Sequence, residues 1–451
     1  METITRWFPP PAPAEPIKDP KTVEEDYRYW RVRILYAMFL GYAVYYFTRG
    51  TFAIAMPELK KMGIDEVSLG WTATLFQLAY AVSKFTSGII ADRSNPRYFM
   101  AAGLILTGII NIVFGLSASI LLLAMLWSLN GWFQGWGSAP CHRLLTHWYS
   151  QSERGRWWSF WNTSHNIGAA LLPLIAAPII GVWGWAAGMW LPGLLGIVVG
   201  LILINRLRDT PQSLGLPRVE TFRKDNPQGL SESESERELG TREILFKHVL
   251  SNPHIWLLAV GFFFIQTTRW AISQWSYHYL VTAQEYANWE AAKCIFWFEA
   301  GGFTGGIVAG WMSDILFQGR RGPVNVIFSV SLIPAIFGLG WVTGHPSLLW
   351  MTESFMALCG FFIFGPHMMA MVAAAEVAHK KASATAVGFL GIVAYIGCSL
   401  TGGPLGHVIR DWGWEYFFRI LEIGGITSAI CFLPLWGVGV KREEAQATGA
   451  F

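Results

Sequence analysis

Charged residues are scarce in this chain of 451 residues. They make up only 14% of it, whereas 53% of the residues are apolar, and a soluble domain carries about 25% charged residues. Together with a mean hydropathy of +0.37, this excludes an ordinary soluble enzyme and a disordered chain. The net charge of +3 is too small to indicate a nucleic-acid partner.

Paired cysteines and nucleotide-binding motifs are missing as well. None of the five cysteines is in a C-x-x-C pair, and four of them lie inside apolar stretches, so no disulfide framework or zinc site is indicated. The sequence has no G-x-x-x-x-G-K-[ST] loop, which argues against direct use of ATP, and neither G-x-S-x-G nor H-E-x-x-H occurs. We therefore expect no cofactor, no metal and no enzymatic activity.

Long apolar runs fill most of the chain, and a helix that spans a bilayer needs about 20 apolar residues. We expect an all-α polytopic membrane protein with 12 transmembrane helices in two pseudo-symmetric six-helix halves. The expected domains are an N-terminal segment at 1–33, the halves at 34–205 and 254–438, a polar linker at 206–253 and a tail at 439–451. The expected spans are 34–56, 68–91, 98–116, 119–141, 157–178, 183–205, 254–281, 289–313, 323–343, 347–373, 383–409 and 414–438.

Lysine and arginine are distributed very unevenly between these spans. Of 33 such residues, 25 fall on the side of the termini and the linker, and 3 on the other side. The positive-inside rule therefore predicts a multi-pass protein of the inner (cytoplasmic) membrane with both termini in the cytoplasm. Residues 1–33 lack an apolar segment with a cleavage site, so we expect no removable signal peptide.

The two expected halves repeat each other. The Gly88–Asp92 spacing recurs at Gly310–Asp314 with an offset of 222, and Arg49 recurs at Arg269 with an offset of 220. Pro140 and Pro366 differ by 226. Duplicated halves of this kind bind their substrate at the interface between them, near the bilayer midplane.

The stretch 88–97 reads G-x-x-x-D-R-x-x-x-R and is similar to the loop signature of the major facilitator superfamily. Its charges lie at the cytoplasmic end of a span and can hold the two halves together in one conformation. The alternative is ordinary loop topology, with basic residues that only set orientation. The expected conformational latch consists of Gly88, Asp92, Arg93, Arg97 and Asp314.

Arg49 and Arg269 lie well inside expected spans, where an arginine costs roughly 2.5–3.5 kcal/mol even on the mild insertion scale. At equivalent positions they would also repel each other, unless an anion binds between them. A guanidinium binds phosphate or carboxylate through two hydrogen bonds. A phosphate monoester carries about −1.5 to −2 charges, so two arginines match it better than a single carboxylate. The alternative is a buried acid for each arginine, and Glu299 is the main candidate because no Asp or Glu occurs at 34–57 or 254–284.

Other polar side chains in the expected spans are candidates for the same site. Lys84 can supply a third cation or extend to the membrane surface. His165 can share its proton with a phosphate, or it can be a packing residue. Tyr42, Tyr45 and Tyr46 share one helical face with the first arginine. Their hydroxyls can bind phosphate or sugar oxygens, or their rings can pack between helices.

Motifs in both halves resemble the organophosphate:phosphate antiporter family of the major facilitator superfamily. Within that family the chain is most similar to the bacterial hexose-phosphate sensor and transporter branch, with the glycerol-3-phosphate transporter and the glucose-6-phosphate translocase of the endoplasmic reticulum as relatives. The stretches that carry the family resemblance are 41–49, 83–97, 131–137, 161–168, 208–217 and 310–314, and those that indicate the branch are 97–100, 133–138 and 361–366.

The resemblance implies antiport of an organic phosphate against inorganic phosphate by alternating access. It implies that Arg49 and Arg269 hold the phosphoryl group, and that Lys84 and His165 take part in substrate binding or translocation. The positions that match the lining of the central cavity are Tyr42, Tyr46, Gln134, Trp161, Asn162 and Tyr395.

Three positions depart from the family pattern. Gly50 stands where the family usually has a lysine, and Gln274 where it commonly has an aspartate, so the sum of charges is unchanged. Gln266 replaces a tyrosine found in some members. An amide suits a sugar hydroxyl better than a glycerol backbone, so we count Gln266 among the residues that contact the sugar.

The sequence therefore predicts a transporter that exchanges hexose 6-phosphate, above all glucose 6-phosphate, for inorganic phosphate, driven by solute gradients. Its expected partners are the two phosphates and the lipid bilayer, with no nucleic acid. An alternative is a membrane receptor for external hexose phosphate that transports little and signals through a membrane histidine kinase, since both would need the same pocket. A third is a proton-coupled anion symporter, for which Glu299 is the one available acid.

Overall fold

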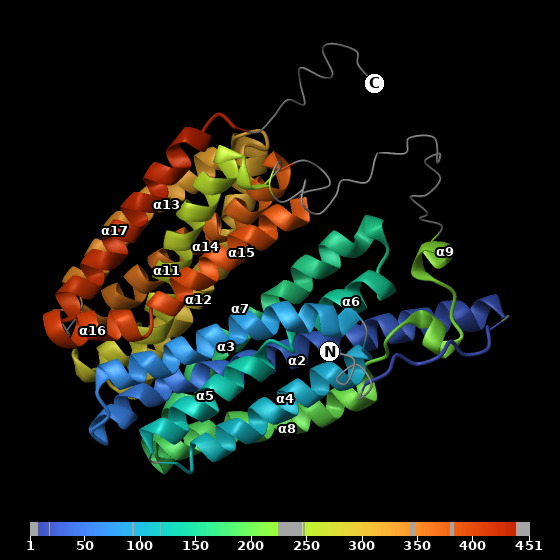
Figure 1. The fold of residues 1–451 in the computed structure, drawn as a ribbon, viewed down its shortest axis with the longest axis horizontal. Helices are drawn as coiled ribbons and strands as arrows, with labels where there is room; N and C mark the ends of the chain where they lie inside the picture. The colour runs from blue at the N-terminus through green and yellow to red at the C-terminus, as the bar shows by residue number, and fades with distance from the viewer. Residues whose placement is uncertain are drawn as a thin grey trace. The chain divides into compact units, whose positions relative to one another are not determined.

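The protein is described by a computed structural model, in which regular secondary structure is helical throughout the described part (Figure 1). The described residues are 8–17, 19–92, 94–117, 119–223, 246, 249–342, 348–378 and 383–438. Side chains inside some helices, Asp92 and Gly88 among them, are outside this description.

Each of the twelve expected spans coincides with a helix or with a pair of consecutive helices. These are α2 (Pro20–Lys61), α3 (Glu66–Asp92), α4 (Pro96–Phe114), α5 (Ile120–Gln134) with α6 (Ser138–Trp148), α7 (Gln151–Trp183), α8 (Trp185–Arg206), α11 (Pro253–Thr282), α12 (Asn288–Trp311), α13 (Arg321–Val342), α14 (Leu349–Val377), α15 (Ser383–Leu400) with α16 (Gly403–Trp412), and α17 (Trp414–Phe432).

Eight of these helices are long and apolar enough to cross a membrane by length and composition, counted over the described residues. The remaining expected spans are also helical, in α2, α3, α5 with α6, and α12. Three of these spans contain a charged residue that we considered for the phosphate site, namely Arg49 in α2, Lys84 in α3 and Glu299 in α12. Charged residues lower the hydropathy of a span, and inside a membrane they mark functional positions.

The fourth and eleventh spans are broken rather than continuous. The fourth leaves the helix at Gly135, where a Cβ atom would lie 2.3 Å from Ser83 Oγ and 2.9 Å from Lys84 N. The chain resumes as α6 at Ser138, with Pro140 in its first turn. The eleventh breaks between Leu400 and Gly403. An apolar run does not reveal such breaks, because hydropathy continues across them.

Contacts divide the chain into two compact units. Unit 1 comprises Met1–Ala55 and Leu75–Glu236, and unit 2 comprises Met56–Thr74 and Arg237–Phe451. The end of α2, the turn after it and the start of α3 therefore belong to unit 2, although they precede most of unit 1 in the chain.

In unit 1, helices α4 and α8 lie side by side (Figure 1). Glycines allow this close approach, because a Cβ on Gly108 would lie 2.5 Å from the carbonyl oxygen of Gly193, and a Cβ on Gly193 would lie 2.7 Å from that of Gly108. Small residues at a helix interface let backbones pack closely in a membrane, where no hydrophobic effect drives association.

The same packing device recurs at equivalent places in the two units. In unit 1, Gly131 on α5 lies against the carbonyl of Phe76 on α3, and in unit 2 Gly360 on α14 lies against the carbonyl of Phe298 on α12. The offsets, 229 and 222, are close to those of the sequence repeat. The repeat seen in the motifs is thus also a repeat of helix contacts.

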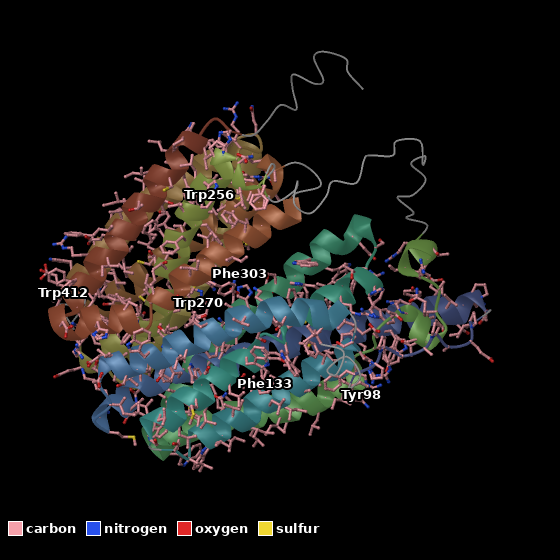
Figure 2. The ribbon with its side chains drawn as sticks, viewed as in Figure 1. Tyr98, Phe133, Trp256, Trp270, Phe303 and Trp412 are labelled. Carbon is pink, nitrogen blue, oxygen red and sulfur yellow. The ribbon has the colours of Figure 1, made fainter. Side chains whose placement is uncertain are left out.

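Aromatic side chains are exposed near helix ends in both units (Figure 2). Tyr98 lies in the first turn of α4, Trp256 in the first turn of α11 and Trp412 at the end of α16. The indole of Trp256 donates a hydrogen bond to the Leu250 carbonyl at 2.8 Å. Tyrosine and tryptophan concentrate at membrane–water interfaces, so these positions indicate where the helices leave the hydrocarbon.

Candidate functional site

Arg49 lies on α2 in unit 1 and is only 8% exposed. Its guanidinium carbon is 4.2 Å from the ring centroid of Tyr80, 5.4 Å from that of Phe76 and 5.5 Å from that of Tyr46. The negative face of an aromatic ring stabilises a cation without adding net negative charge. Such an environment lowers the cost of burying the positive charge of the arginine.

A buried polar network fixes the backbone directly before Arg49. The carbonyl of Thr48 accepts hydrogen bonds from Asn111 Nδ2 at 2.9 Å and Asn130 Nδ2 at 3.0 Å, and Thr48 Oγ1 accepts one from Gln134 Nε2 at 2.9 Å. Three helices, α2, α4 and α5, are joined in this way. Since the network is buried, it holds the turn that carries Arg49 in one position.

Gln134, expected to line the cavity, is part of this network. It is 5% exposed, and its amide nitrogen also donates to the Tyr45 carbonyl at 3.1 Å. The structure thus gives Gln134 contacts that position α2. Gly50, directly after Arg49, stands where the family usually has a lysine. It packs against Leu172, since a Cβ at this position would lie 2.5 Å from Leu172 Cδ2.

A row of aromatic rings runs from Arg49 along α2 to α7. The ring of Tyr46 lies 5.3 Å from that of His165 and 5.6 Å from that of Tyr42, and Tyr42 lies 4.7 Å from Trp161. The structure therefore brings together Arg49, Tyr46, His165, Tyr42 and Trp161, all of which were expected to lie in one site. Asn162, next to Trp161 on α7, is half-buried.

Lys84 lies on α3, one turn after Tyr80. Its Nζ lies 5.8 Å from the ring centroid of Tyr80, the same ring that covers Arg49. The side chain is exposed within unit 1. The ring of Tyr80 thus lies near both Arg49 and Lys84, two of the residues that were expected to bind the phosphoryl group.

Arg269 lies on α11 in unit 2 and is 9% exposed. Its guanidinium carbon is 4.4 Å from the ring centroid of Phe364 and 5.9 Å from that of Trp270. Its Nε is buried without a hydrogen-bond partner among the described residues. Arg269 therefore resembles Arg49 in burial and in its aromatic cover, and it retains donor capacity.

Glu299, on α12, is 4% exposed and lies within electrostatic range of Arg269. Its Oε2 has no hydrogen-bond partner in the described part of the chain, and the same holds for Arg269 Nε. The acid that we considered as a partner for an arginine is thus near Arg269 but does not neutralise it through a direct contact.

The remaining expected residues of unit 2 are partly accessible or buried. Gln266, one turn before Arg269, is 8% exposed and its Oε1 is buried without a hydrogen bond among described groups. Gln274 Nε2 lies 3.2 Å from Met56 Sδ. Tyr395 on α15 is half-buried.

The expected latch is only partly visible. Asp314 forms an ion pair with Arg321, which also binds Glu376 at 3.1 Å, all within unit 2. Arg97 donates from Nε to the Ile204 carbonyl within unit 1. The side chains of Gly88 and Asp92 are outside the description, and Arg93 lies outside the described residues.

Sequence reasoning missed two histidines. His142 on α6 stacks on Trp158 at 4.5 Å, lies 5.4 Å from Trp161 and is within electrostatic range of Lys84. His367 on α14 stacks on Phe262 at 5.6 Å. A signal was available, because each histidine follows within two residues one of the prolines that mark the repeat, Pro140 and Pro366.

The fold and these residues define a class. Twelve helical spans in two units that repeat each other, with a buried arginine in the equivalent helix of each, make a multi-pass membrane protein of transporter architecture. The comparisons with known proteins agree with that class. The model of the Major Facilitator Superfamily matches residues 38–402.

Relatives and a solved structure extend over nearly the whole chain. The chain is 50% identical to a "Probable hexose phosphate transport protein" of Chlamydia trachomatis, over 97% of both chains. It is 46% identical to a "Membrane sensor protein UhpC" of Salmonella typhimurium, over 97% of this chain and 98% of the other. An inward-facing bacterial homologue of the human lysosomal transporter Spinster superposes with a TM-score of 0.68 at 17% identity, over 90% and 95% of the two chains. The protein belongs to the major facilitator superfamily, and its relatives match the organophosphate:phosphate antiporter branch.

Proposed function

We propose that this protein is an antiporter that exchanges hexose 6-phosphate, above all glucose 6-phosphate, for inorganic phosphate by alternating access. The observation that carries the proposal is the pair of buried arginines at equivalent positions, each covered by aromatic rings. The printed name of the Chlamydia relative supports a hexose phosphate as the substrate.

Arg49 and Arg269 bind the phosphoryl group, and Lys84 and His165 assist binding or translocation. Tyr42, Tyr46, Trp161, Asn162, Gln266 and Tyr395 contact the sugar or line its path, and Gln134 acts through the backbone of α2. Gly88, Asp92, Arg93, Arg97 and Asp314 act in the conformational latch. Both termini lie in the cytoplasm, in keeping with the distribution of basic residues.

Charge explains why transport would be an exchange. Without a ligand, two cations in a low-dielectric cavity oppose the approach of the halves that alternating access requires. A bound phosphate dianion offsets both charges, so the loaded carrier reorients readily. Inorganic phosphate and a sugar phosphate carry the same group, and either can perform this task.

A second candidate is a receptor for external hexose phosphate, which the name of the Salmonella relative favours. Such a receptor would bind the sugar phosphate with the same residues, transport little of it and signal through a membrane histidine kinase. The two candidates differ in transport rather than in binding.

Uptake of labelled glucose 6-phosphate by phosphate-loaded proteoliposomes that contain only this protein tests the proposal. Protein-free liposomes are the control, and binding to the detergent-purified protein is measured in parallel. We expect binding together with uptake well above the control. Binding without uptake would favour the receptor, and absence of both would contradict a hexose phosphate as the ligand.

A further inference from the structure

Three arginines from other segments of unit 1 gather at the C-terminal end of α8, which itself ends at Arg206, and none of the three belongs to the proposed phosphate ligands. Arg97 donates to the Ile204 carbonyl, Arg33 donates to the carbonyl and Oδ1 of Asn205 at 3.1 and 2.7 Å, and Arg208 donates to the Asn205 carbonyl at 3.0 Å. The last carbonyls of a helix lack intrahelical partners. The guanidinium groups therefore converge on one helix end from α2, α4 and the start of the linker.

This end carries a surplus of positive charge. Among the described residues, the hydrogen-bond partners of these arginines are carbonyls, an amide and the Tyr29 hydroxyl, and none is a carboxylate. A helix C-terminus offers only about half a negative charge. The pKa of Arg208 is lowered, first by burial and then by the charges of Arg97 and Arg33, so the arginines lie close enough to repel one another.

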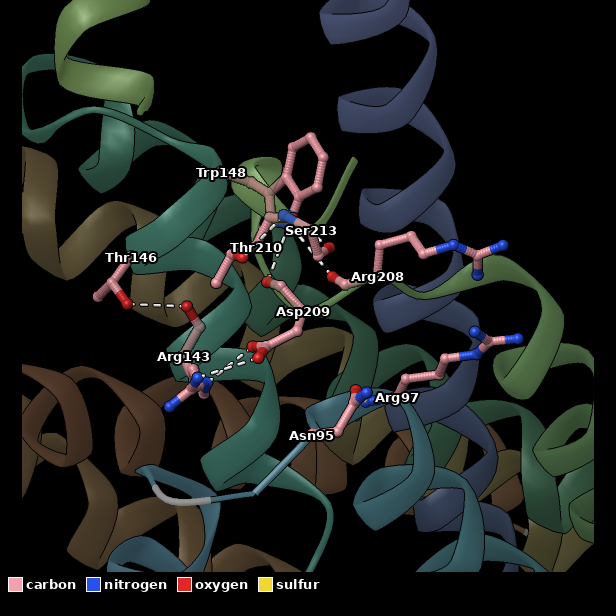
Figure 3. A network of polar contacts seen from close by, with 9 residues as sticks. All are labelled: Asn95, Arg97, Arg143, Thr146, Trp148, Arg208, Asp209, Thr210 and Ser213. Atoms are coloured by element: carbon pink, nitrogen blue, oxygen red, sulfur yellow. Dashed lines mark hydrogen bonds and ion pairs between the residues drawn. The ribbon is translucent and has the colours of Figure 1, made fainter. Parts of the chain in front are cut away.

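Hydrogen bonds fix the backbone that carries Arg208. Trp148 Nε1 donates to the carbonyls of Arg208 and Asp209 at 3.2 Å, and Asp209 binds Arg143 through two hydrogen bonds of 2.8 and 3.1 Å. Figure 3 shows this network, with the side chains of Arg97 and Arg208 extending away from it toward the same side. The cationic groups are thus presented on a fixed frame.

A groove of about 450 Å³ begins at the same helix end. It is lined by Val198, Leu201 and Ile202 along α8, and by Asn205 and Arg206 at the end. Leu201 is 56% exposed, and Asn205 is also the residue that binds Arg33 and Arg208. The apolar face of α8 that lines this open groove therefore reaches the cationic end, and Asn205 belongs to both.

Aromatic side chains place this cationic end at a membrane interface. Trp30 lies beneath two of the arginines, with its ring centroid 4.7 Å from the guanidinium carbons of both Arg33 and Arg208. Tyr98, labelled in Figure 2, is 5.0 Å from that of Arg97. Trp30 is half-buried and Tyr98 is exposed, and tryptophan and tyrosine beside arginine are typical of the headgroup level of a bilayer.

We propose that this surface is a binding site for an anionic phospholipid. Its phosphodiester would bind Arg33, Arg97 and Arg208, and one acyl chain would follow the groove along Val198, Leu201 and Ile202. Basic pockets between membrane helices recognise anionic headgroups in this way. A free phosphate or sugar phosphate would meet the arginines but leave the apolar groove unfilled. This inference does not depend on the proposed exchange activity.

The test measures lipid retained by the purified full-length protein in native mass spectrometry. Dioleoyl phosphatidylglycerol is compared with dioleoyl phosphatidylethanolamine, and glycerophosphoglycerol serves as a competitor without chains. The variants are the double Arg33→Gln/Arg208→Gln and Leu201→Trp, which fills the groove from an exposed position. Arg223→Gln is the matched control, because this arginine lies in the same unit but pairs with Glu153 at 3.3 Å.

We expect the wild-type protein and Arg223→Gln to retain phosphatidylglycerol over phosphatidylethanolamine. The double variant should lose about twenty-five-fold in affinity, at roughly fivefold per arginine, and Leu201→Trp should also bind less. Equal retention of both lipids, or an unchanged double variant, would overturn the proposal. Normal binding by Leu201→Trp, or full competition by glycerophosphoglycerol, would indicate a site for a free anion and would overturn it as well.

Discussion

Arg49 and Arg269 are both covered by aromatic ring faces, at 4.2 Å from Tyr80 and 4.4 Å from Phe364. A ring face lowers the cost of burying a cation, but it leaves the positive charge in place. A ligand with two negative charges can then gain binding free energy from both arginines. The shape of a guanidinium matters for this binding as well as its charge, since it offers two parallel N–H donors to one phosphate.

Replacement of Arg49 by lysine tests that geometry. Arg49→Lys keeps the charge but removes the paired donors. Glucose 6-phosphate should therefore bind about ten- to a hundredfold more weakly, because one charge-assisted hydrogen bond, worth about 1.5–3 kcal/mol, is lost. Arg419→Lys is the control, because that side chain is 56% exposed and pairs with Glu415 and Glu422. Equilibrium binding of labelled substrate measures both. Near-normal affinity of Arg49→Lys would show that the arginine does not bind the phosphoryl group.

Glu153 gives a second prediction at the scale of single residues, at the start of α7. Burial alone would raise its pKa, but the hydrogen bond and the charge of Arg31, 2.5 Å away, and the charge of Arg223 outweigh burial and lower it. A lowered pKa in the folded state means that this contribution to stability is complete above the ordinary value of 4.5 and is lost as pH falls through the folded value.

Thermal unfolding between pH 3 and pH 7 measures this contribution. Glu153→Gln should lower Tm by about 2–4 °C at pH 7, the shift expected for roughly 1 kcal/mol. The difference from wild type should shrink as pH falls below the ordinary value of 4.5 and through the lower folded pKa, where the wild-type carboxylate takes up its proton. A Tm difference that stays constant across this range would mean that the ion pair with Arg31 does not contribute.

The sequence singled out the residues of the candidate site, but it could not give the contacts that hold them in place. Apolar context singled out Arg49 and Arg269, and helical spacing placed Tyr42 and Tyr46 with the first of them. The role of Gln134 as a support for α2 was not predictable, because it depends on a contact with Thr48, which is 86 residues away in the chain. His142 was missed because it lies just past the end of the expected span.

At the scale of helices, hydropathy predicted the spans but not their breaks or their full length. It placed the first span at 34–56, whereas α2 begins at Pro20 and runs for 42 residues. The additional turns are polar, but they pack through Tyr27, whose ring stacks on Phe222 at 4.0 Å and whose hydroxyl donates to the Pro217 carbonyl. Contacts between segments nearly 200 residues apart leave no periodic trace in the sequence.

The break between α15 and α16 provides a prediction at this scale. In unit 2 Thr74 Oγ1 donates to the Ser399 carbonyl and accepts from Gly403 N, both at 2.9 Å. A Cβ on Gly402 would lie 2.4 Å from the Gly70 carbonyl oxygen and 2.2 Å from Thr74 Oγ1. The start of α3 can therefore approach α16 only because these positions are glycine.

Gly402→Ala should force α3 and α16 apart and destabilise the protein by about 1–3 kcal/mol. Gly391→Ala on α15 is the matched control, since nothing lies within 4 Å of a Cβ built there, and alanine in a helix is favoured over glycine by about 0.5–1 kcal/mol. Thermal unfolding should show a lower Tm for the first variant and an unchanged or higher Tm for the second. Equal Tm values would contradict the close approach.

At the scale of the whole molecule, each unit carries one cation of the proposed pair, and a transport cycle has to move both. The internal repeat explains how one kind of site arose twice, with Arg49 on α2 and Arg269 on α11. The sequence predicted this repeat from three offsets, and the contacts of Gly131 and Gly360 show it again in the packing. The central claim is that the charges of both units must be offset before the carrier can reorient.

The dependence of uptake on internal anion tests that claim most directly. Proteoliposomes are loaded either with inorganic phosphate or with an uncharged osmolyte at equal osmolarity, and initial uptake of labelled glucose 6-phosphate is compared. The account predicts rapid uptake only with phosphate inside, at least about tenfold above the phosphate-free vesicles, which is the effect of about 1.4 kcal/mol on the reorientation barrier. Equal rates in both sets of vesicles would show that the empty carrier reorients freely, and would contradict obligatory exchange through the two arginines.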